Sequence, residues 1–409
     1  MENPKIRFKG FTKDWEQRKF GEITELKSAS RVHKDEWTSN GVPFYRSSDV
    51  MTAINGTENE KAFISEELYE KLSKVSGKLE EGDILVTGGG SVGNPYIVPD
   101  NKPLYTKDAD LLWIKNKGKF HPYFLYEFFF SPTFRNYLGS ISHVGTIAHY
   151  TITQLSDTPI SLPSFEEQKE VGEYFQSLDC LITLHQRKCE QTKKLKKYML
   201  QKMFPQNGEK IPKIRFDGFT YDWEQRKLGD MGSTFTGLSG KTKENFGHGD
   251  AQFITYMNVF SNPVANLEMT EAVEIDAKQN CVKKGDVFFT TSSETPEEVG
   301  MSCVMPENKD NIYLNSFCFG YRPTEKFDLD YLAYVLRADS FRQEMTFLAQ
   351  GISRYNISKN KVMEVSIPIP NLEEQTMVGR YFSNLDHLIT LHQRQTDFYK
   401  KTSFYFISS

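Results

Sequence analysis

The glycine-rich run Gly88-Gly89-Gly90-Ser91 is one place where this sequence could bind a phosphate group. Phosphate-binding loops end in Lys followed by Ser or Thr, because backbone amides and an ammonium group together neutralise the phosphate oxygens. This run lacks that ending, and no Gly-x-Gly-x-x-Gly run follows a predicted strand with an acidic residue suitably placed downstream. The sequence therefore predicts no site for a nucleotide or for S-adenosylmethionine on this chain.

Other residues with catalytic potential also lack the spacing that catalysis needs. Asn94-Pro95-Tyr96 is similar to the Asn-Pro-Pro-Tyr/Phe motif of DNA amino-methyltransferases, but the second proline is missing and a plain turn fits better. The eight histidines are scattered and the five cysteines have no Cys-x-x-Cys spacing, which favours neither a zinc site nor a disulfide framework. No carboxylate cluster of the nuclease type stands out. We expect a noncatalytic chain with no metal or cofactor of its own.

Composition sets further limits. The 409 residues, of which 38% are hydrophobic and 13% aromatic, indicate folded protein with more than one core. No long apolar run suggests a membrane span or a signal peptide, so we expect a cytoplasmic protein. The net charge of −4 argues against nonspecific coating of DNA, and any DNA binding must rely on local patches or on a partner.

The chain is a tandem duplication. Pro4–Lys19 recurs almost unchanged as Pro212–Lys227, an offset of 208 residues. Further along, two blocks recur at an offset of 207: Glu166–Gln168 as Glu373–Gln375, and Leu181–Arg187 as Leu388–Arg394. The enclosed segments, 20–163 and 228–370, share little sequence. Two variable units therefore lie in a duplicated frame.

The frame contains two long helices. Ser164 is a plausible N-cap, and the first apolar stripe continues until Pro205. The stripes predict two amphipathic helices packed by a coiled-coil-like seam, with candidate interface residues Val171, Phe175, Leu178, Ile182 and His185 in the first, and Val378, Phe382, Leu385, Ile389 and His392 in the second. The alternative is that each stripe packs only on its own domain. His185 and His392 are expected to pack or to form an inter-helix hydrogen bond.

The variable segments read as mixed α/β domains of shared architecture. Short strands are expected over 42–45, 83–87, 111–114, 253–257, 286–291 and 316–321, and helical stretches over 123–138 and 329–349. The predicted fold class is α/β (α+β), with two mixed domains joined by two long helices in a pseudo-twofold internal repeat. We divide the chain into a first domain (1–163), a central helix (164–204), a second domain (205–370) and a C-terminal helix (371–409).

A constant frame around paired variable inserts suits a recognition protein, and a family resemblance follows from its motifs. These are Trp15–Lys19 with its copy Trp223–Lys227, the strand-like run Pro43–Val50, the turn Gly82–Leu85, and Pro163–Gln168 with its copy Pro370–Gln375. Their order, repeated twice, resembles the specificity subunit of type I restriction-modification systems (HsdS) over essentially the whole chain. No single motif is specific, but the repeated order is.

The resemblance implies a DNA specificity subunit with two target-recognition domains, each of which reads one half of a bipartite site in double-stranded DNA. The two helices would form an antiparallel spacer that sets the distance between the half-sites and docks the methyltransferase subunits. The implied partners are two methyltransferase subunits and, in the complete enzyme, two motor-nuclease subunits, which would carry S-adenosylmethionine, ATP and Mg²⁺. The last turns of the second helix depart from the first copy, because KKLKKYMLQKMFPQ in the first copy corresponds to the shorter and less basic KKTSFYFISS in the second.

Reading of base edges requires hydrogen-bonding side chains on protruding loops. In the first domain the candidates are Arg31, His33, Lys34, Arg46, Ser47, Ser48, Thr87, Ser91, His143, Thr146 and His149. In the second domain they are Lys241, Lys243, Tyr256, Asn258, Thr291, Ser292, Ser353, Arg354, Tyr355 and Asn356. The run Ser353–Asn356 is the strongest, because Arg, Tyr and Asn supply guanine-, phosphate- and adenine-type contacts in one loop.

Two alternatives remain open at this stage. The basic run from Arg187 to Lys202 could face phosphates, but a solvated helix face is equally consistent, and the second copy is less basic. A noncatalytic scaffold with two ligand-binding domains on a helical dimeriser would also use polar variable loops. Specific retention of DNA distinguishes this scaffold from a DNA reader.

Overall fold

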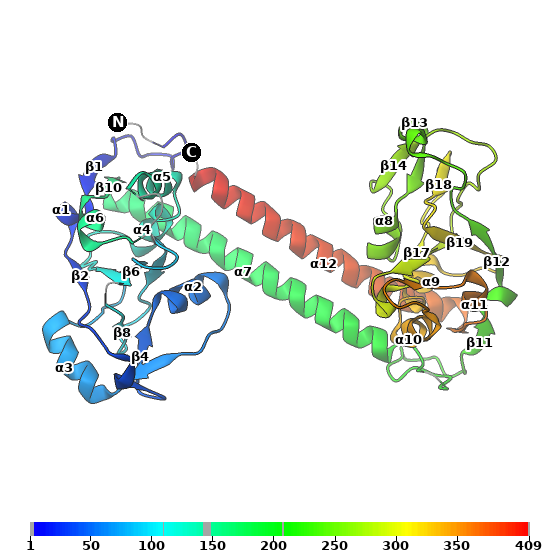
Figure 1. Ribbon diagram of the computed structural model, residues 1–409, viewed down its shortest axis with the longest axis horizontal. Coiled ribbons are helices and arrows are strands. Elements are labelled where there is room, and N and C mark those ends of the chain that lie inside the picture. Colours follow the sequence, from blue (N-terminus) through cyan, green and yellow to red (C-terminus); the bar gives the residue numbers. More distant parts are fainter. Residues whose placement is uncertain (1–3, 109, 142–148, 207, 408–409) are drawn as a thin grey trace. The chain divides into compact units, whose positions relative to one another are not determined.

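The structure is a computed structural model that describes residues 4–108, 110–141, 149–206 and 208–407 (Figure 1). The chain forms two compact units, the first made of residues 1–186 with 394–409 and the second of residues 187–393. Each unit thus takes one part of each long helix. The four-segment division of the sequence stays a prediction.

The first unit contains two four-stranded sheets and a two-stranded ribbon. The sheets have the strand orders β2-β9-β6-β7 and β3-β5-β4-β8, and β1 pairs with β10 in the ribbon. The strands are β1 (Glu16–Lys19), β2 (Leu26–Ser28), β3 (Trp37–Thr38), β4 (Val42–Tyr45), β5 (Ala62–Ile64), β6 (Ile84–Thr87), β7 (Pro95–Ile97), β8 (Tyr105–Thr106), β9 (Leu111–Ile114) and β10 (Pro159–Leu162). The helices are α1 (Phe20–Ile23), η1 (Lys34–Glu36), α2 (Ser47–Asn55), α3 (Glu66–Ser76), α4 (Pro122–Phe128), α5 (Pro132–Ile141), α6 (Ile152–Asp157) and the start of α7 (Phe165–Lys202).

The second unit repeats this plan. Its sheets have the orders β12-β19-β15-β17 and β14-β13-β18, with two-stranded pairs β11-β21 and β16-β20. The strands are β11 (Glu224–Lys227), β12 (Gly232–Thr236), β13 (Phe246–Ile254), β14 (Thr270–Val273), β15 (Val287–Thr290), β16 (Ser292–Ser293), β17 (Ser302–Val304), β18 (Ile312–Leu314), β19 (Cys318–Pro323), β20 (Tyr355–Asn356) and β21 (Ser366–Ile369). The helices are η2 (Leu228–Asp230), η3 (Lys243–Asn245), α8 (Tyr256–Ser261), η4 (Pro296–Glu298), α9 (Leu329–Val335), α10 (Asp339–Leu348), α11 (Lys359–Met363) and α12 (Leu372–Ile407).

The two variable segments share their architecture, as the sequence predicted. The order β2-β9-β6-β7 in the first unit corresponds to β12-β19-β15-β17 in the second. The second sheet matches too, because β4 pairs antiparallel with β5 and parallel with β8, while β13 pairs antiparallel with β14 and parallel with β18. Each variable segment therefore builds the same strand arrangement from a different sequence.

Three predicted elements differ from the observed ones, each for a local reason. The helix expected over 123–138 is broken into α4 and α5 just before Pro132, which cannot continue a helical hydrogen-bond ladder. The helix expected over 329–349 is divided into α9 and α10, where Ala338 has an extended backbone. The strand expected over 253–257 stops at Ile254, because the Thr255 side chain accepts a hydrogen bond from the Asn258 amide and caps α8.

The long helices begin where their caps predict. The Ser164 hydroxyl accepts a hydrogen bond from the Glu167 amide at 3.3 Å, and the Asn371 side chain accepts one from the Glu374 amide at 2.9 Å. In the second unit the Lys196 ammonium group contacts the Asp386 carboxylate at 2.6 Å. In the first unit the rings of His185 and Tyr399 lie 5.7 Å apart. Within each unit, late residues of one helix thus lie opposite early residues of the other, so the helices pack antiparallel.

Candidate nucleic-acid interface

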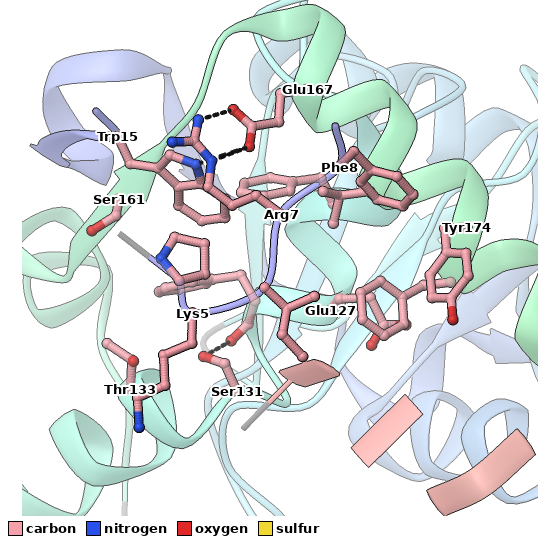
Figure 2. A pocket seen from close by; sticks show the side chains of 16 residues that line it. Lys5, Arg7, Phe8, Trp15, Glu127, Ser131, Thr133, Ser161, Glu167 and Tyr174 are labelled. Carbon is pink, nitrogen blue, oxygen red and sulfur yellow. Dashed lines mark hydrogen bonds and ion pairs between the residues drawn. The ribbon is translucent and has the colours of Figure 1, made fainter. Parts of the chain in front are cut away.

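In each unit two copied blocks are joined by an arginine–glutamate ion pair and a tryptophan hydrogen bond, which together we call the clamp. In the first unit Arg7 donates two hydrogen bonds to the Glu167 carboxylate, at 2.8 and 2.7 Å, and the Trp15 indole N–H donates a third at 3.3 Å (Figure 2). The Glu167 side chain is only 3% exposed. A bidentate guanidinium–carboxylate pair of this kind fixes orientation as well as charge. The start of the chain is thus fastened to the first turn of α7.

The second unit has the same clamp. Arg215 donates to both oxygens of Glu374, at 2.7 and 2.8 Å, and the Trp223 indole donates at 3.1 Å. The following glutamine also has the same role in both units: the Gln168 side chain bonds the Pro163 carbonyl, and the Gln375 side chain bonds the Pro370 carbonyl. The arginine and tryptophan contacts join two separate copied blocks in each unit, whereas the glutamine contact lies within one block.

Variable loops of the second unit form a polar cavity. A cavity of about 400 Å³ is lined by Tyr256, Met257, Phe260, Ser292, Ser293, Glu294, Glu298, Ser353 and Arg354. Four of the residues predicted from sequence, Tyr256, Ser292, Ser353 and Arg354, are brought together here although they are far apart along the chain. The β16-β20 pair explains this, since Ser292 lies opposite Asn356 and Ser293 lies opposite Tyr355.

Gly351 makes that loop possible. Its φ is 149°, and a Cβ added to it would collide with the carbonyl of Arg354. The chain can therefore turn tightly enough for Gln350 and Asn356 to form a bridge, which leaves Ser353, Arg354 and Asn356 exposed. Tyr355 is half-buried.

The cavity offers both donors and acceptors. Arg354 has five N–H donors and is exposed, whereas Glu294 and Glu298 supply carboxylate oxygens, one of which accepts from the Ser293 hydroxyl at 3.2 Å. The Tyr256 hydroxyl donates to the Ser292 carbonyl at 2.8 Å. Burial raises the pKa of the Tyr256 phenol, so that this group stays a neutral donor. Arg matches the acceptors of guanine and Glu the donor of cytosine, so the arrangement is able to read G·C pairs.

Several second-unit candidates have contacts within the protein. Asn258 is fully buried, and its amide donates to the carbonyls of Asn266 and Met269 at 2.7 and 2.9 Å. The Thr291 hydroxyl donates to the Phe317 carbonyl, and Lys241 pairs with Asp276 at 3.1 Å. Lys243 is exposed. Asn258 thus lies inside the fold, where its amide supports the loop that follows α8.

In the first unit one set of candidates gathers around Asp110. The Ser47 hydroxyl donates to the Asp110 carbonyl at 3.1 Å, and the same carbonyl accepts from the Gly88 amide in the glycine-rich loop. Exposed Ser91 follows this loop in the sequence, and exposed His149 lies beside Gly89 in the fold. The candidates Arg31, His33 and Lys34 are exposed beside η1, away from this set. His143 and Thr146 lie outside the described residues.

Two first-unit candidates act inside the fold. Thr87 is fully buried; its hydroxyl donates to the Ser91 carbonyl and accepts from the Asn94 amide. Arg46 is half-buried and binds the Asp49 carboxylate at 2.9 Å and the Glu60 carbonyl. Thr87 therefore supports the glycine-rich loop from within, while Ser48 is exposed in the first turn of α2.

Sequence reasoning missed the apolar and acidic members of the second-unit surface. Met257 is 55% exposed and Ile352 is 97% exposed, and both lie in or next to the cavity loops. Apolar side chains can contact the methyl group of thymine. Because Met257 lies in a segment predicted as a strand, its outward direction could not be read from the pattern. Glu294 follows Ser293 directly in the sequence and Glu298 comes four residues later, and that proximity was the available signal.

Comparison with known proteins identifies what this duplicated arrangement is. A family model described as the type I restriction modification DNA specificity domain matches residues 12–194 and again residues 221–397. The chain belongs to this family. Its function is DNA sequence recognition within a type I restriction-modification system, and it is a recognition subunit rather than a catalytic one.

Individual specificity subunits are similar over most of the chain. The type I restriction enzyme MjaVIII specificity subunit of Methanocaldococcus jannaschii is 23% identical over 350 residues, which are 82% of this chain and 80% of the relative. The putative MjaX specificity subunit of the same organism is 24% identical over 410 residues, with 94% and 89% covered.

Solved structures of specificity subunits share the fold. The type I S subunit from M. genitalium aligns with a TM-score of 0.61 at 13% identity, covering 99% of this chain and 98% of that one. HsdS from Thermoanaerobacter tengcongensis aligns with a TM-score of 0.50 at 18% identity, covering 96% and 95%. These likenesses confirm the predicted fold class of two mixed domains joined by long helices.

In this specificity subunit the apolar residues of the two long helices pack on the rest of each unit and on the neighbouring helix. Val378, Phe382 and Leu385 join the core of the second unit, and the Cys189 thiol contacts the Ile389 carbonyl of the neighbouring helix at 3.9 Å. Phe175, Leu178 and His185 are buried in the first unit, and Val171 and Ile182 are half-buried, as is His392. Each long helix thus packs both on the other helix and on its own unit, although the two arrangements were expected as alternatives.

No group of three or more His, Cys, Asp or Glu side chains among the described residues is arranged to hold a metal ion. No helix among the same residues is both long and apolar enough to cross a bilayer.

Proposed function

We propose that each unit of this specificity subunit reads one half of a bipartite site in double-stranded DNA. The observation that carries the proposal is the contrast between the two units. They share strand order and the Arg–Trp–Glu clamp, whereas the loops that these elements hold differ in sequence. Shared geometry with different polar loops suits two readers of two different half-sites.

In the second unit, the reader would be the cavity that contains Arg354. Arg354 would donate to a guanine edge and Asn356 to an adenine edge, while Lys243 would contact a phosphate. In the first unit, the reader would include Ser48, Ser91 and His149 around the glycine-rich loop, with Arg31, His33 and Lys34 at a second exposed position. The exposure of these side chains supports their assignment.

The paired helices would set the distance between half-sites and dock two methyltransferase subunits. One helical turn advances about 5.4 Å, whereas one base pair advances about 3.4 Å, so small changes in helix length would change the spacer in the DNA. The basic face from Arg187 to Lys202 supports this role, because Lys193, Lys194 and Lys197 are exposed and available to a partner or to solvent.

The catalytic groups of the assembly would belong to partner subunits. The two methyltransferase subunits would bind S-adenosylmethionine, and two motor-nuclease subunits would use ATP and Mg²⁺ in the restriction complex. A chromosomal DNA substrate would place the assembly in the cytoplasm.

Replacement of Arg354 and Asn356 by alanine tests the reading surface. The double variant should lose roughly 2–6 kcal/mol of affinity for the cognate site, because each good base contact contributes about 1–3 kcal/mol. Lys278→Ala is a matched control, since Lys278 is exposed in the same unit but away from the cavity. Unchanged cognate affinity in the double variant would remove this loop from the reader.

The two-reader arrangement is tested in cells that carry this subunit with a type I methyltransferase. Methylome sequencing should show one split motif, and exchange of residues 228–370 for another variable segment should change one half of it only. If both halves change, or if no split motif depends on the chain, the arrangement is wrong.

A further inference from the structure

The first unit contains a large cavity beside its clamp. The cavity has a volume of about 880 Å³ and is lined by Arg7, Trp15, Phe124, Glu127 and Phe175, among other residues (Figure 2). Its size is that of a site for a ligand or for several side chains of a protein partner. Figure 2 shows the Trp15 indole next to the Arg7–Glu167 pair, with the Phe8 and Tyr174 rings to the right of them.

The second unit has the same walls, but there a side chain fills the space. Phe204, at the end of α7, is 1% exposed and packs against Trp223, Tyr331 and Phe382 at ring distances of 6.3, 5.9 and 5.6 Å. These three residues correspond through the duplication to Trp15, Phe124 and Phe175, which line the cavity of the first unit. Met203 is buried in the same cluster. The second unit therefore shows that these walls can hold a phenylalanine and a methionine side chain.

The described part of α12 does not supply the equivalent side chains. By the same offset of 207 residues, Ile407 corresponds to Leu200, so no described residue of α12 corresponds to Met203 or Phe204. The cavity of the first unit is therefore lined by the counterparts of residues that pack around Met203 and Phe204 in the second unit.

The charged residues near the cavity also differ between the two units. In the second unit Asp386 contacts the Lys196 ammonium group at 2.6 and 2.7 Å and accepts from the Tyr334 hydroxyl at 2.8 Å. The corresponding residues of the first unit are Asp179, Ser403 and Glu127. Two carboxyl groups thus replace a carboxylate balanced by a lysine and a tyrosine.

Neither carboxyl group has a cation. Among the described residues, no ion pair is found for Glu127 or Asp179, although Glu127 is 8% exposed. Burial, with a smaller contribution from Asp179, raises the pKa of Glu127 to about 8, and burial also raises the pKa of Asp179. A positively charged group brought to this wall would relieve both effects.

We propose that this cavity is a docking site for a partner protein that inserts a large apolar side chain, Phe or Met, together with a lysine or arginine. The apolar side chain would occupy the position that Phe204 has in the second unit, and the cation would approach Asp179 and Glu127 as Lys196 approaches Asp386. Because the second unit is already filled, only one of the two otherwise similar units would take this partner. The proposal does not depend on which unit reads which DNA sequence.

A peptide with the sequence of residues 193–206, KKLKKYMLQKMFPQ, is a suitable probe, because it contains the residues that fill the second unit. Its binding to the full-length chain can be measured by fluorescence anisotropy of a labelled peptide. We expect saturable binding that weakens at least tenfold when the peptide carries Phe204→Ala and several-fold when it carries Lys196→Ser. Equal binding of the Phe204→Ala peptide, or no saturable binding, would overturn the proposal.

Variants of the full-length chain locate the peptide. Val171 lines the cavity, and its counterpart Val378 is 2% exposed in the filled second unit. Val171→Trp should occupy the cavity, leave the melting temperature nearly unchanged and abolish peptide binding, whereas Val378→Trp should lower the melting temperature.

A second variant covers the case in which Val171→Trp does not fold. Asp179→Asn keeps the side-chain shape but removes a charge, and it should weaken peptide binding several-fold. If Val171→Trp folds and still binds the peptide, or if Asp179→Asn binds it as tightly as the unaltered chain, the peptide docks elsewhere and the inference fails. If a small aromatic cation binds to the chain but the peptide does not, the cavity is a small-molecule site and the inference of a protein partner is wrong.

Discussion

Phe204→Ala provides a quantitative test of the core of the second unit. Phe204 is 1% exposed and touches three other aromatic rings, so its removal leaves a space that rigid neighbours cannot close. Truncation of a buried Phe to Ala costs about 3–5 kcal/mol, from lost transfer free energy and from the cavity. For a unit of this size, 1 kcal/mol changes the melting temperature by about 2–4 °C. The expected decrease is therefore roughly 6–20 °C.

The assay is urea denaturation followed by pulsed hydrogen exchange, which reports the two units separately. The loss should appear in peptides of residues 187–393 and be smaller in those of the first unit. Phe347→Ala is the matched control, because Phe347 is in the same unit but 84% exposed, and surface changes of this kind usually stay within about 0.5 kcal/mol. A loss below about 1 kcal/mol for Phe204→Ala would refute the assignment of Phe204 as the filler of this core.

Three further predictions address the clamp, the acidic wall and DNA binding. Arg215→Ala should lower the free energy of unfolding by about 3 kcal/mol in urea denaturation, because Glu374, with a side chain 1% exposed, loses its charged partner and keeps only the Trp223 indole; a change near zero would contradict the clamp. The Glu127 carboxyl has a folded-state pKa of about 8 against an ordinary value of 4.5, so the folded chain holds a proton that the unfolded chain releases between these values. Its contribution to the free energy of unfolding should be full below about pH 4.5 and decrease by up to about 5 kcal/mol as the pH rises from there through 8. Glu127→Gln should remove this dependence, and identical pH profiles for both proteins would argue against it. Lys243→Ala should weaken binding to cognate and scrambled DNA equally and reduce the slope of log affinity against log salt by about 1, whereas a change confined to cognate DNA would make Lys243 a base reader.

The duplicated frame was predictable because its signals are local or repeated. The cap Ser164, the stripes of α7 and α12 and the strand at Val42–Tyr45 follow from residue types and spacing, and the structure has them as expected. The clamp was not predicted, although Arg7 and Glu167 both lie in copied blocks. Their contact spans 160 residues, and pattern reasoning gives no distance between blocks.

The candidate site was predicted as a set of loops but not as individual contacts. The β16-β20 pair brings Ser292 next to Asn356. Strands of two residues are too short to show a periodic pattern, so the sequence does not predict this pairing. Asn258 has the composition of a base reader, yet its amide is used to hold the loop from Asn266 to Met269. Burial of a polar side chain depends on tertiary neighbours, so the same residue type serves as a reader at one position and as a structural support at another.

The division of the long helices between the units has a consequence for synthesis on the ribosome. The second unit is one continuous stretch, residues 187–393, whereas the first needs residues 394–407 in addition to its N-terminal part. Multidomain chains usually complete their domains in the order of translation, with the N-terminal domain first. Here the order is reversed, since the later half has all its residues before the earlier half does. The part of α7 around His185, which packs on Tyr399, is therefore uncovered until the last stretch of α12 has been translated.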